Sequence, residues 1–336
     1  MITFLISQSF YFIVPLLIVA LAGMFSEKSG TVNIALEGIM IIGAFAGIMF
    51  ISVMQKSGAL SNQPQLLLII ALVISALAGM LFTSLLGFLA INMKANQTIG
   101  GVALNILAAA LAIFLARTLT TEGVSHIRFE KVFKLDSNLL LKVFPNAPEG
   151  GIISSLNKIF FYDAYLTTYL AVIIFVISTV VIYKTRFGMR LSACGEHPQA
   201  VQSVGINVYK YRWAGILISG ALAGIGGLAY VIPTSVSFNG DVAGYGFLAL
   251  AVLIFGQWKP GRILFAAIFF GAFQTLSNTF IGIEFIRVWI DKNPGVPIGM
   301  FFRLMPYIIT MVALAISSKS SRAPKAAGVP FDPRGV

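Results

Sequence analysis

Two pairs of polar side chains interrupt apolar stretches of this chain at a spacing of four residues. Asn33 and Glu37 form the first pair, and Gln274 and Asn278 form the second. Residues four apart lie on one face of a helix, so each pair would present its polar groups in one direction. Asn105 adds an amide within another apolar stretch. Amides both donate and accept hydrogen bonds, which suits the passage of an uncharged, hydroxylated solute.

Glu37 has two interpretations at this point. A carboxylate inside a membrane span is costly and is by default a functional candidate. Alternatively, Glu37 lies at the interface and caps or pairs locally, with Lys28 as a partner. The amides also have a structural alternative, because amides join neighbouring helices in membranes. Asn239, with Phe238 and Asp241, is expected to line the external mouth of a path.

Motifs for enzyme chemistry are missing from the sequence. It contains no GxxxxGK[ST] phosphate loop, no HExxH zinc helix and no GxSxG nucleophile turn. The two histidines, His126 and His197, fall outside the apolar spans. A single cysteine, Cys194, excludes an intrachain disulfide and a cysteine-based metal site. We expect no catalytic residues and no resident cofactor or metal.

Composition predicts an all-α polytopic membrane protein. The 336 residues are 58% hydrophobic and 10% charged, whereas soluble domains carry about 25% charge. The net charge of +11 would suggest a nucleic-acid partner in a soluble protein. Here the basic residues cluster in short loops between apolar spans, as insertion into the plasma (inner) membrane requires. No binding to nucleic acid is expected.

About 20 apolar residues cross a bilayer, and this rule predicts nine spans in a single transmembrane domain covering 1–336. The first, seventh and ninth are short, so broken or re-entrant helices are expected there. The predicted spans are 9–25, 32–53, 66–92, 97–117, 161–183, 212–232, 241–258, 263–282 and 304–318.

Basic residues predict the orientation of these spans. The loop 184–211 and the tail 319–336 are both basic, and Lys259 and Arg262 flank another short turn. With nine spans all three segments fall on one side, which is then cytoplasmic. The C-terminus is predicted inside and the N-terminus outside, and 118–160 is an external insert.

The nine spans divide as four, one and four. Each block of four contains a turn with glycine and asparagine, at Ser29–Asn33 and at Asn239–Gly246. We interpret this as an inverted repeat, which would place a solute path near the midplane. Chance similarity between apolar segments is the alternative.

The segment Arg186–Gly205 is a polar, basic interruption between two apolar spans. Pro198 stands where a first helical turn would begin, and Gly205 where a short helix would stop. A short capped helix over Pro198–Val204 is predicted to dock on another protein.

Several motifs together resemble the permease subunits of ABC importers. The broad family includes ribose, galactose and branched-chain amino-acid permeases, and the chain is more similar to the simple-sugar/nucleoside branch. It resembles the shorter, second permease of nucleoside importers. The motifs are Phe25–Gly47, Thr185–Arg212, Ile218–Tyr230, Phe247–Pro260 and the tail RAPKAAGVPF.

The resemblance implies that the loop helix beginning at Pro198 is a coupling helix seated in a partner ATPase, which would hold ATP and Mg²⁺. Glu196, Ala200 and Gly205 match the family's pattern of an acid, a small residue and a glycine; His197 is expected to be structural. The resemblance also implies a second permease subunit, typically a different protein, and an external substrate-binding lipoprotein.

The leading hypothesis is therefore a permease subunit that forms the solute pathway of an ATP-driven importer for nucleosides or simple sugars. A stand-alone secondary transporter or channel for a small polar solute is the alternative. It would need a network of coupling carboxylates, and Glu37 is a solitary deep acid. A third hypothesis is a scaffold subunit that transports nothing.

Overall fold

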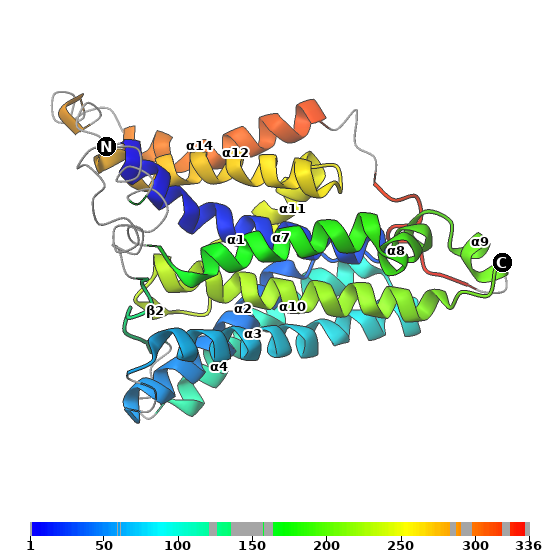
Figure 1. Ribbon diagram of the computed structural model, residues 1–336, viewed down its shortest axis with the longest axis horizontal. Helices are drawn as coiled ribbons and strands as arrows, with labels where there is room; N and C mark the ends of the chain where they lie inside the picture. The colour runs from blue at the N-terminus through cyan, green and yellow to red at the C-terminus, as the bar shows by residue number, and fades with distance from the viewer. Residues whose placement is uncertain are drawn as a thin grey trace.

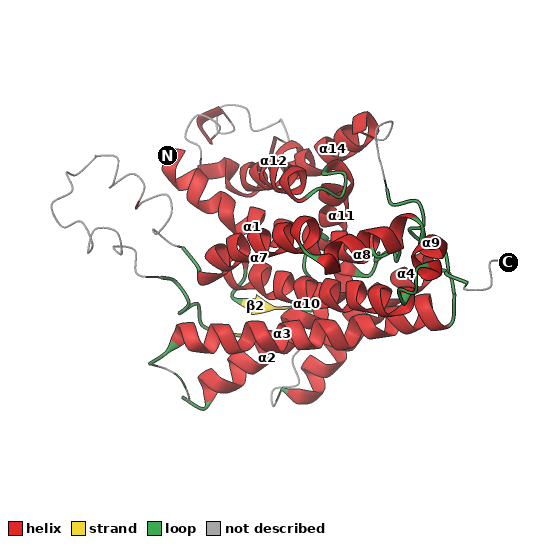
Figure 2. Ribbon diagram, turned by 45° about the vertical axis from the view of Figure 1, so that its right-hand side comes forward, coloured by secondary structure: helices red, strands yellow, loops and turns green. Residues whose placement is uncertain are grey.

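The chain is described here from a computed structural model. The described residues are 2–58, 60, 62–120, 126–135, 157, 164–282, 287–289, 298–317 and 323–332. Most of the predicted external insert 118–160 therefore lies outside the described residues. Figure 2 shows that nearly all the regular structure is helical.

The helices follow one another as predicted, with one additional helix in the basic loop. The order is α1 (Ile2–Lys28), α2 (Leu36–Lys56), α3 (Pro64–Gly87) continued by a π-turn (Phe88–Asn92), α4 (Gln97–Leu119), α7 (Leu166–Lys184), α8 (Arg186–Glu196), α9 (Pro198–Ser203), α10 (Val208–Thr234), α11 (Tyr245–Phe255), α12 (Pro260–Thr279) with a 3₁₀ turn (Phe280–Gly282), and α14 (Ile298–Ser317). Two short strands, β1 (Ile127–Arg128) and β2 (Ser237–Phe238), pair antiparallel with Ile127 opposite Phe238.

Six described helices are long and apolar enough to cross a membrane, namely α1, α2, α3 with its π-turn, α4, α7 and α10. The chain is a polytopic membrane protein. The short predicted span 9–25 is part of the 27-residue α1 and has no break. By contrast, α11 has 11 residues, and at 1.5 Å per residue it reaches only about 16 Å, roughly half of a bilayer core.

Helix α10 lies at the centre of the bundle and packs against α1, α2 and α3 (Figure 1). Small residues permit this approach. A Cβ added at Gly43 of α2 would meet the main chain of Gly224 in α10, and one added at Gly79 of α3 would meet the Gly220 carbonyl. These glycines therefore allow the close approach of α2 and α3 to α10.

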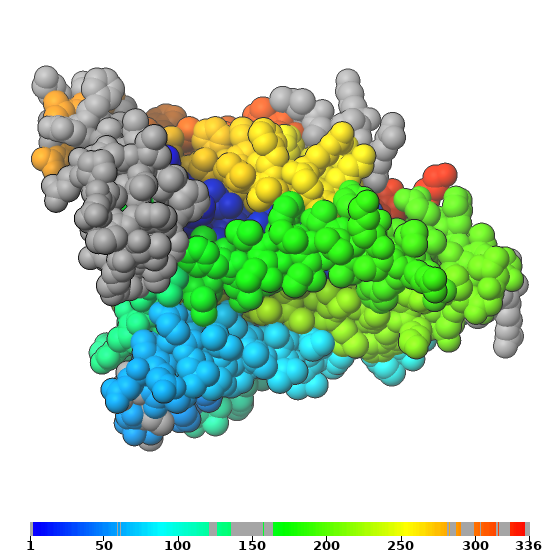
Figure 3. Space-filling view, viewed as in Figure 1, coloured from blue at the N-terminus to red at the C-terminus, as the bar shows by residue number. Residues whose placement is uncertain are grey.

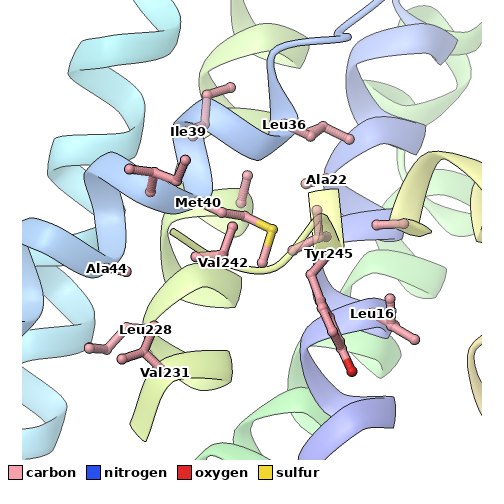
Figure 4. Packing of buried hydrophobic residues seen from close by; sticks show 14 of the residues in the cluster. Leu16, Ala22, Leu36, Ile39, Met40, Ala44, Leu228, Val231, Val242 and Tyr245 are labelled. Atoms are coloured by element: carbon pink, nitrogen blue, oxygen red, sulfur yellow. The ribbon is translucent and has the colours of Figure 1, made fainter. Parts of the chain in front are cut away.

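The buried core sits around these contacts. Side chains from α1, α2, α10 and α11 converge in Figure 4, among them Leu16, Met40, Val231 and Tyr245. Helix α7 covers one face of the molecule (green in Figure 3) and packs on α1. Its outer residues, such as Ile173 and Val176, are exposed, as expected for a surface that faces lipid or a partner subunit.

The predicted basic segments gather at one end of the molecule. In Figure 1, α8, α9 and the described tail lie at the right-hand end, with β2 near the opposite end. The Ala326 N–H donates to the Gly195 carbonyl at 2.8 Å, which joins the tail to α8. Lys28 is electrostatically close to both Glu196 and Lys259, which brings the α11–α12 turn to the same end.

Candidate solute pathway and coupling surface

An unwound stretch, residues 29–35, separates α1 from α2. Asn33 lies in this stretch, and α2 begins only at Leu36. The prediction that Asn33 and Glu37 share one helix face is therefore wrong. The four-residue spacing predicted a continuous helix, whereas the chain turns here with Gly30 at φ +95°.

Side chains of α4 hydrogen-bond the main chain of this unwound stretch. The Gln97 side-chain oxygen accepts from the Val32 N–H at 2.7 Å. Asn105 donates from Nδ2 to the Ile34 carbonyl at 2.9 Å. Its Oδ1 accepts from the Gly38 N–H at 2.8 Å, so Asn105 also caps the start of α2. Both hydrogen-bonding ends of this amide are thus used.

Asn33 is buried and turns towards α10. Its Nδ2 donates to the Ser219 hydroxyl at 2.9 Å, and its Oδ1 accepts from the Ala35 N–H at 3.1 Å. Helix α10 begins at Val208, and Ser219 lies roughly 16 Å further along its axis. We call Asn33, Glu37, Gln97, Asn105 and Ser219 the polar hub; it lies inside the bundle rather than at its end.

Glu37 joins the hub to α11. Its Oε1 accepts from the Gly244 N–H at 2.9 Å, and its Oε2 accepts from the Gly246 N–H at 2.6 Å. Gly244 has φ +76° and is the N-cap residue of α11. The carboxylate thus satisfies main-chain N–H groups that a helix start leaves unpaired, and it places negative charge at the positive end of the helix dipole. The structure therefore shows a cap on the distant helix α11 rather than the local cap or the pairing with Lys28 considered from the sequence.

The second predicted pair, Gln274 and Asn278, lies on α12. Asn278 is exposed, and its Nδ2 donates to the Gln274 main-chain carbonyl at 2.8 Å. The Gln274 side chain is half-buried and adjoins the Tyr245 hydroxyl. The rings of Tyr245 and Tyr230 lie 4.1 Å apart between centroids, and Tyr230 is an electrostatic neighbour of Glu37. Gln274 therefore approaches the hub region, and Asn278 does not.

Asn239 is exposed directly after β2. It lines a surface hollow of about 590 Å³ with His126, Arg128, Phe129, Val236 and Ser237. This hollow belongs to the β1–β2 end of the molecule.

The basic loop contains two helices instead of the single predicted one. Thr185 caps α8 by accepting the Gly188 N–H at 3.1 Å. Glu196 ends α8, His197 stands between the helices, and Pro198 is the first residue of α9. Gly205, at φ +80°, follows the short helix as predicted.

Most residues of the predicted coupling surface in and beside α9 are exposed to solvent. Glu196, His197, Ala200 and Gly205 are all exposed, whereas Pro198 is buried. Val204, just beyond the helix, is 71% exposed.

Glu27 and Trp258 were not singled out from the sequence, but they join two elements at this same end. The Trp258 Nε1 donates to Glu27 Oε2 at 2.6 Å, and both residues are buried. Gln257 and Trp258 have φ of 51° and 54°, a left-handed conformation that is unfavourable for residues with a Cβ. The motif around Trp258 was quoted only for its resemblance, and nothing in its spacing points to Glu27.

Among the described residues, no group of three or more His, Cys, Asp or Glu side chains could hold a metal ion. The site consists instead of amides, hydroxyls, one capping carboxylate and two tyrosines.

Comparison with protein families identifies the family of this chain. A family model described as "Branched-chain amino acid transport system / permease component" matches residues 5–314. The chain belongs to this permease family. The family is one of transport subunits rather than enzymes, in keeping with the missing phosphate loop.

Three curated relatives cover nearly all of this permease. It is 39% identical over 319 residues to the guanosine ABC transporter permease NupQ of Bacillus subtilis, covering 94% of this chain and 92% of the relative. It is 36% identical over 320 residues to the nucleoside ABC transporter permease NupC of Lactococcus lactis, covering 94% and 93%. A second nucleoside permease of that organism, NupB, is 27% identical over 334 residues, covering 94% and 83%. No solved structure matches this permease.

Proposed function

We propose that this permease is the shorter of two different permease subunits in an ATP-driven importer of nucleosides. The observation that carries the proposal is its identity of 39%, along 94% of its length, to a permease named for guanosine. The two Lactococcus relatives support a pair of unlike subunits. This chain covers 93% of NupC but 83% of NupB, so it corresponds in length to NupC.

Coupling to a separate ATPase is proposed at α9. The five residues of the coupling surface are Glu196, His197, Pro198, Ala200 and Gly205. Four of them are exposed, and α9 packs against α8 and the start of α10. A short rigid helix held in this way passes a push from an ATPase on to the membrane helices. His197 has a structural role between α8 and α9.

The solute path is proposed beside the polar hub. Asn33, Glu37 and Asn105 hold its wall in shape, because their polar groups already bond the protein. Gln274 and the Tyr230–Tyr245 pair lie on the α11–α12 side of Glu37. A nucleoside has an aromatic base that suits tyrosine rings and ribose hydroxyls that suit amides. Asn239 lies at the external entrance, and Asn278 faces out from α12 further along the path.

The proposed topology has nine membrane segments, with the N-terminus outside and the C-terminus inside. The seventh segment crosses as a broken helix, of which α11 forms about half. The gathering of the basic segments at the α9 end supports this orientation. The proposed inverted repeat is supported by the hub, since Glu37 brings the turn before α2 against the turn before α11. A lipoprotein would deliver solute at the β1–β2 end.

Uptake of radiolabelled guanosine, uridine and ribose tests the proposal in cells that lack this gene, with and without the gene restored. We expect restored uptake of the two nucleosides and no change for ribose. Restored ribose uptake alone would move the solute class to sugars.

The partner ATPase separates this proposal from a stand-alone transporter. Removing the ATPase gene should abolish nucleoside uptake even when this permease is present at normal amounts in the membrane. Uptake that persists without the ATPase would favour a secondary transporter or channel, and unchanged uptake in every strain would favour a scaffold.

A further inference from the structure

The described tail, residues 323–332, lies across the end of the molecule that carries α9 (red in Figure 1). Its main chain bonds two separate elements. The Ala326 N–H donates to the Gly195 carbonyl of α8 at 2.8 Å, and the Gly328 N–H donates to the Gly30 carbonyl at 3.2 Å. Gly30 belongs to the unwound stretch that leads to the polar hub. We call residues 323–332 the strap.

Arg212 fixes the next part of the strap to α10. Its Nη1 donates to the Val329 carbonyl at 2.9 Å, and its guanidinium carbon lies 5.8 Å from the centre of the Phe331 ring. The side chain of Arg212 is 1% exposed. The strap then reaches a fourth element through an ion pair of 3.4 Å between Lys94 and Asp332.

Phe331 completes a small hydrophobic cluster under α9. The cluster contains Cys194 of α8, Val201 of α9 and Val208 of α10. Phe331 is only 3% exposed, and its ring meets the Tyr209 ring at 5.4 Å between centroids. Since α9 has only six residues, it cannot hold its own position by helix propensity. The strap supplies one wall of the pocket that seats Val201.

These contacts make the strap a physical connection between the coupling loop and the unwound stretch. We propose that the strap is a positioning element that seats α9 and carries its displacement to Gly30, and through the unwound stretch to the polar hub. The inference rests on the proposed function, because it assumes that α9 receives the push of an ATPase. The strap would then help to convert that push into movement of the solute path.

Cys194 reports on the strap independently of transport. It is the only cysteine in the chain and is fully buried in the cluster that Phe331 completes. Burial raises the pKa of its thiol to about 11, so little thiolate is present at neutral pH. Labelling of the intact protein by a maleimide in inside-out membrane vesicles is therefore expected to be slow.

The test compares Phe331→Ala, a chain ending after residue 322, and the control Val329→Ala. Val329 lies in the same strap, but its side chain is 54% exposed and only its carbonyl bonds Arg212. Phe331→Ala and the shortened chain should label at Cys194 at least about tenfold faster, because a buried thiol reacts through local opening. Val329→Ala should label like the wild type.

The same variants, in the complete transporter, are then assayed for solute uptake and ATP hydrolysis, with Glu196→Ala alongside. Phe331→Ala should lower the solute uptake per ATP hydrolysed about tenfold. The rate of ATP hydrolysis itself should stay near that of the wild type, because a positioning element acts on coupling. If its amount in the membrane falls, Phe331→Leu replaces it, because leucine fills most of the same pocket.

Two results would overturn the inference alone. One is unchanged labelling of Cys194 in both strap variants. The other is faster labelling with normal uptake per ATP, while Glu196→Ala still uncouples. If Glu196→Ala also leaves uptake per ATP normal, the proposed coupling at α9 fails as well.

Discussion

Glu37 stands between two helix starts that are more than 200 residues apart in the chain. Its carboxylate accepts N–H groups from Gly244 and Gly246, 207 and 209 residues away. A buried carboxylate with both oxygens used in this way belongs to the framework of the pathway. A substitution of Glu37 that changes transport should therefore also change the stability of the protein.

Glu37→Gln tests this dual role. Glutamine keeps one acceptor oxygen but turns an NH₂ group towards a main-chain N–H, so the α11 start loses a cap. Loss of an N-cap costs about 0.5–2 kcal/mol, and we expect a lower unfolding temperature in detergent with lower nucleoside uptake. Glu130→Gln is the control, because Glu130 is exposed outside the membrane helices. Normal uptake and unchanged stability would remove Glu37 from the pathway framework.

At this scale the sequence predicted the polar residues but not their partners. Asn33, Glu37 and Asn105 were recognisable because polar groups are rare in apolar spans. Gln97 and Ser219 were not recognisable, since ordinary polar residues near helix starts or glycines carry no distinguishing pattern. Asn33 and Ser219 are separated by 186 residues, and no local spacing reports such a contact.

Among the elements, the long helices follow from hydrophobic length, and the errors occur where the chain breaks. Helix α8 was missed because its polar composition was interpreted as loop. Its buried face was nevertheless present in the sequence, with Leu191 and Cys194 three residues apart. The late start of α2 was missed because side chains of α4 and α10 hydrogen-bond the unwound stretch, and no local spacing indicates those contacts.

The coupling surface gives a prediction at the scale of one element. Glu196→Ala should uncouple ATP hydrolysis from uptake and weaken docking of the ATPase, because Glu196 is exposed at the junction of α8 and α9. Membrane insertion should be normal. Solute-stimulated ATPase activity of the purified transporter measures this, with Glu130→Ala as an exposed acid at the opposite end. Unchanged stimulation would count against a docking role for Glu196.

The contact between α2 and α10 gives a second prediction at the scale of the elements. In Gly43→Ala the new methyl group would meet the main chain of Gly224, which cannot move aside as a side chain can. We expect a loss of about 1–3 kcal/mol in the free energy of unfolding, seen as a lower midpoint in thermal unfolding. Gly261→Ala is the matched control, since a Cβ there would meet nothing within 4 Å. Equal midpoints for both variants would contradict the close packing.

For the molecule as a whole, the sequence predicted a polytopic helical membrane protein, and the structure and the family membership confirm that class. Composition was sufficient because a bilayer demands long apolar helices. The arrangement of those helices was not predictable from composition. It depends on the positions of small residues such as Gly79 and Gly220, whose partners lie in other helices.

Orientation is testable on the complete chain. Leu140→Cys, in the predicted external insert and outside the described residues, should react with a membrane-impermeant maleimide in intact cells. Ala200→Cys, exposed on α9, should react only after permeabilisation. The buried native Cys194 should add little background. The reverse pattern of labelling would place the coupling surface outside and overturn the proposed topology.

The unwound stretch also imposes an order on biosynthesis. Its hydrogen-bonding partners leave the ribosome in sequence: Gln97 and Asn105 come first, Ser219 follows, and Gly328 arrives last. At roughly 5–20 residues per second, the interval between Gly30 and Gly328 is on the order of tens of seconds. Throughout that time some main-chain groups at residues 29–35 lack their final partners. Until the strap is synthesised, these groups can be satisfied only by water or by the insertion machinery.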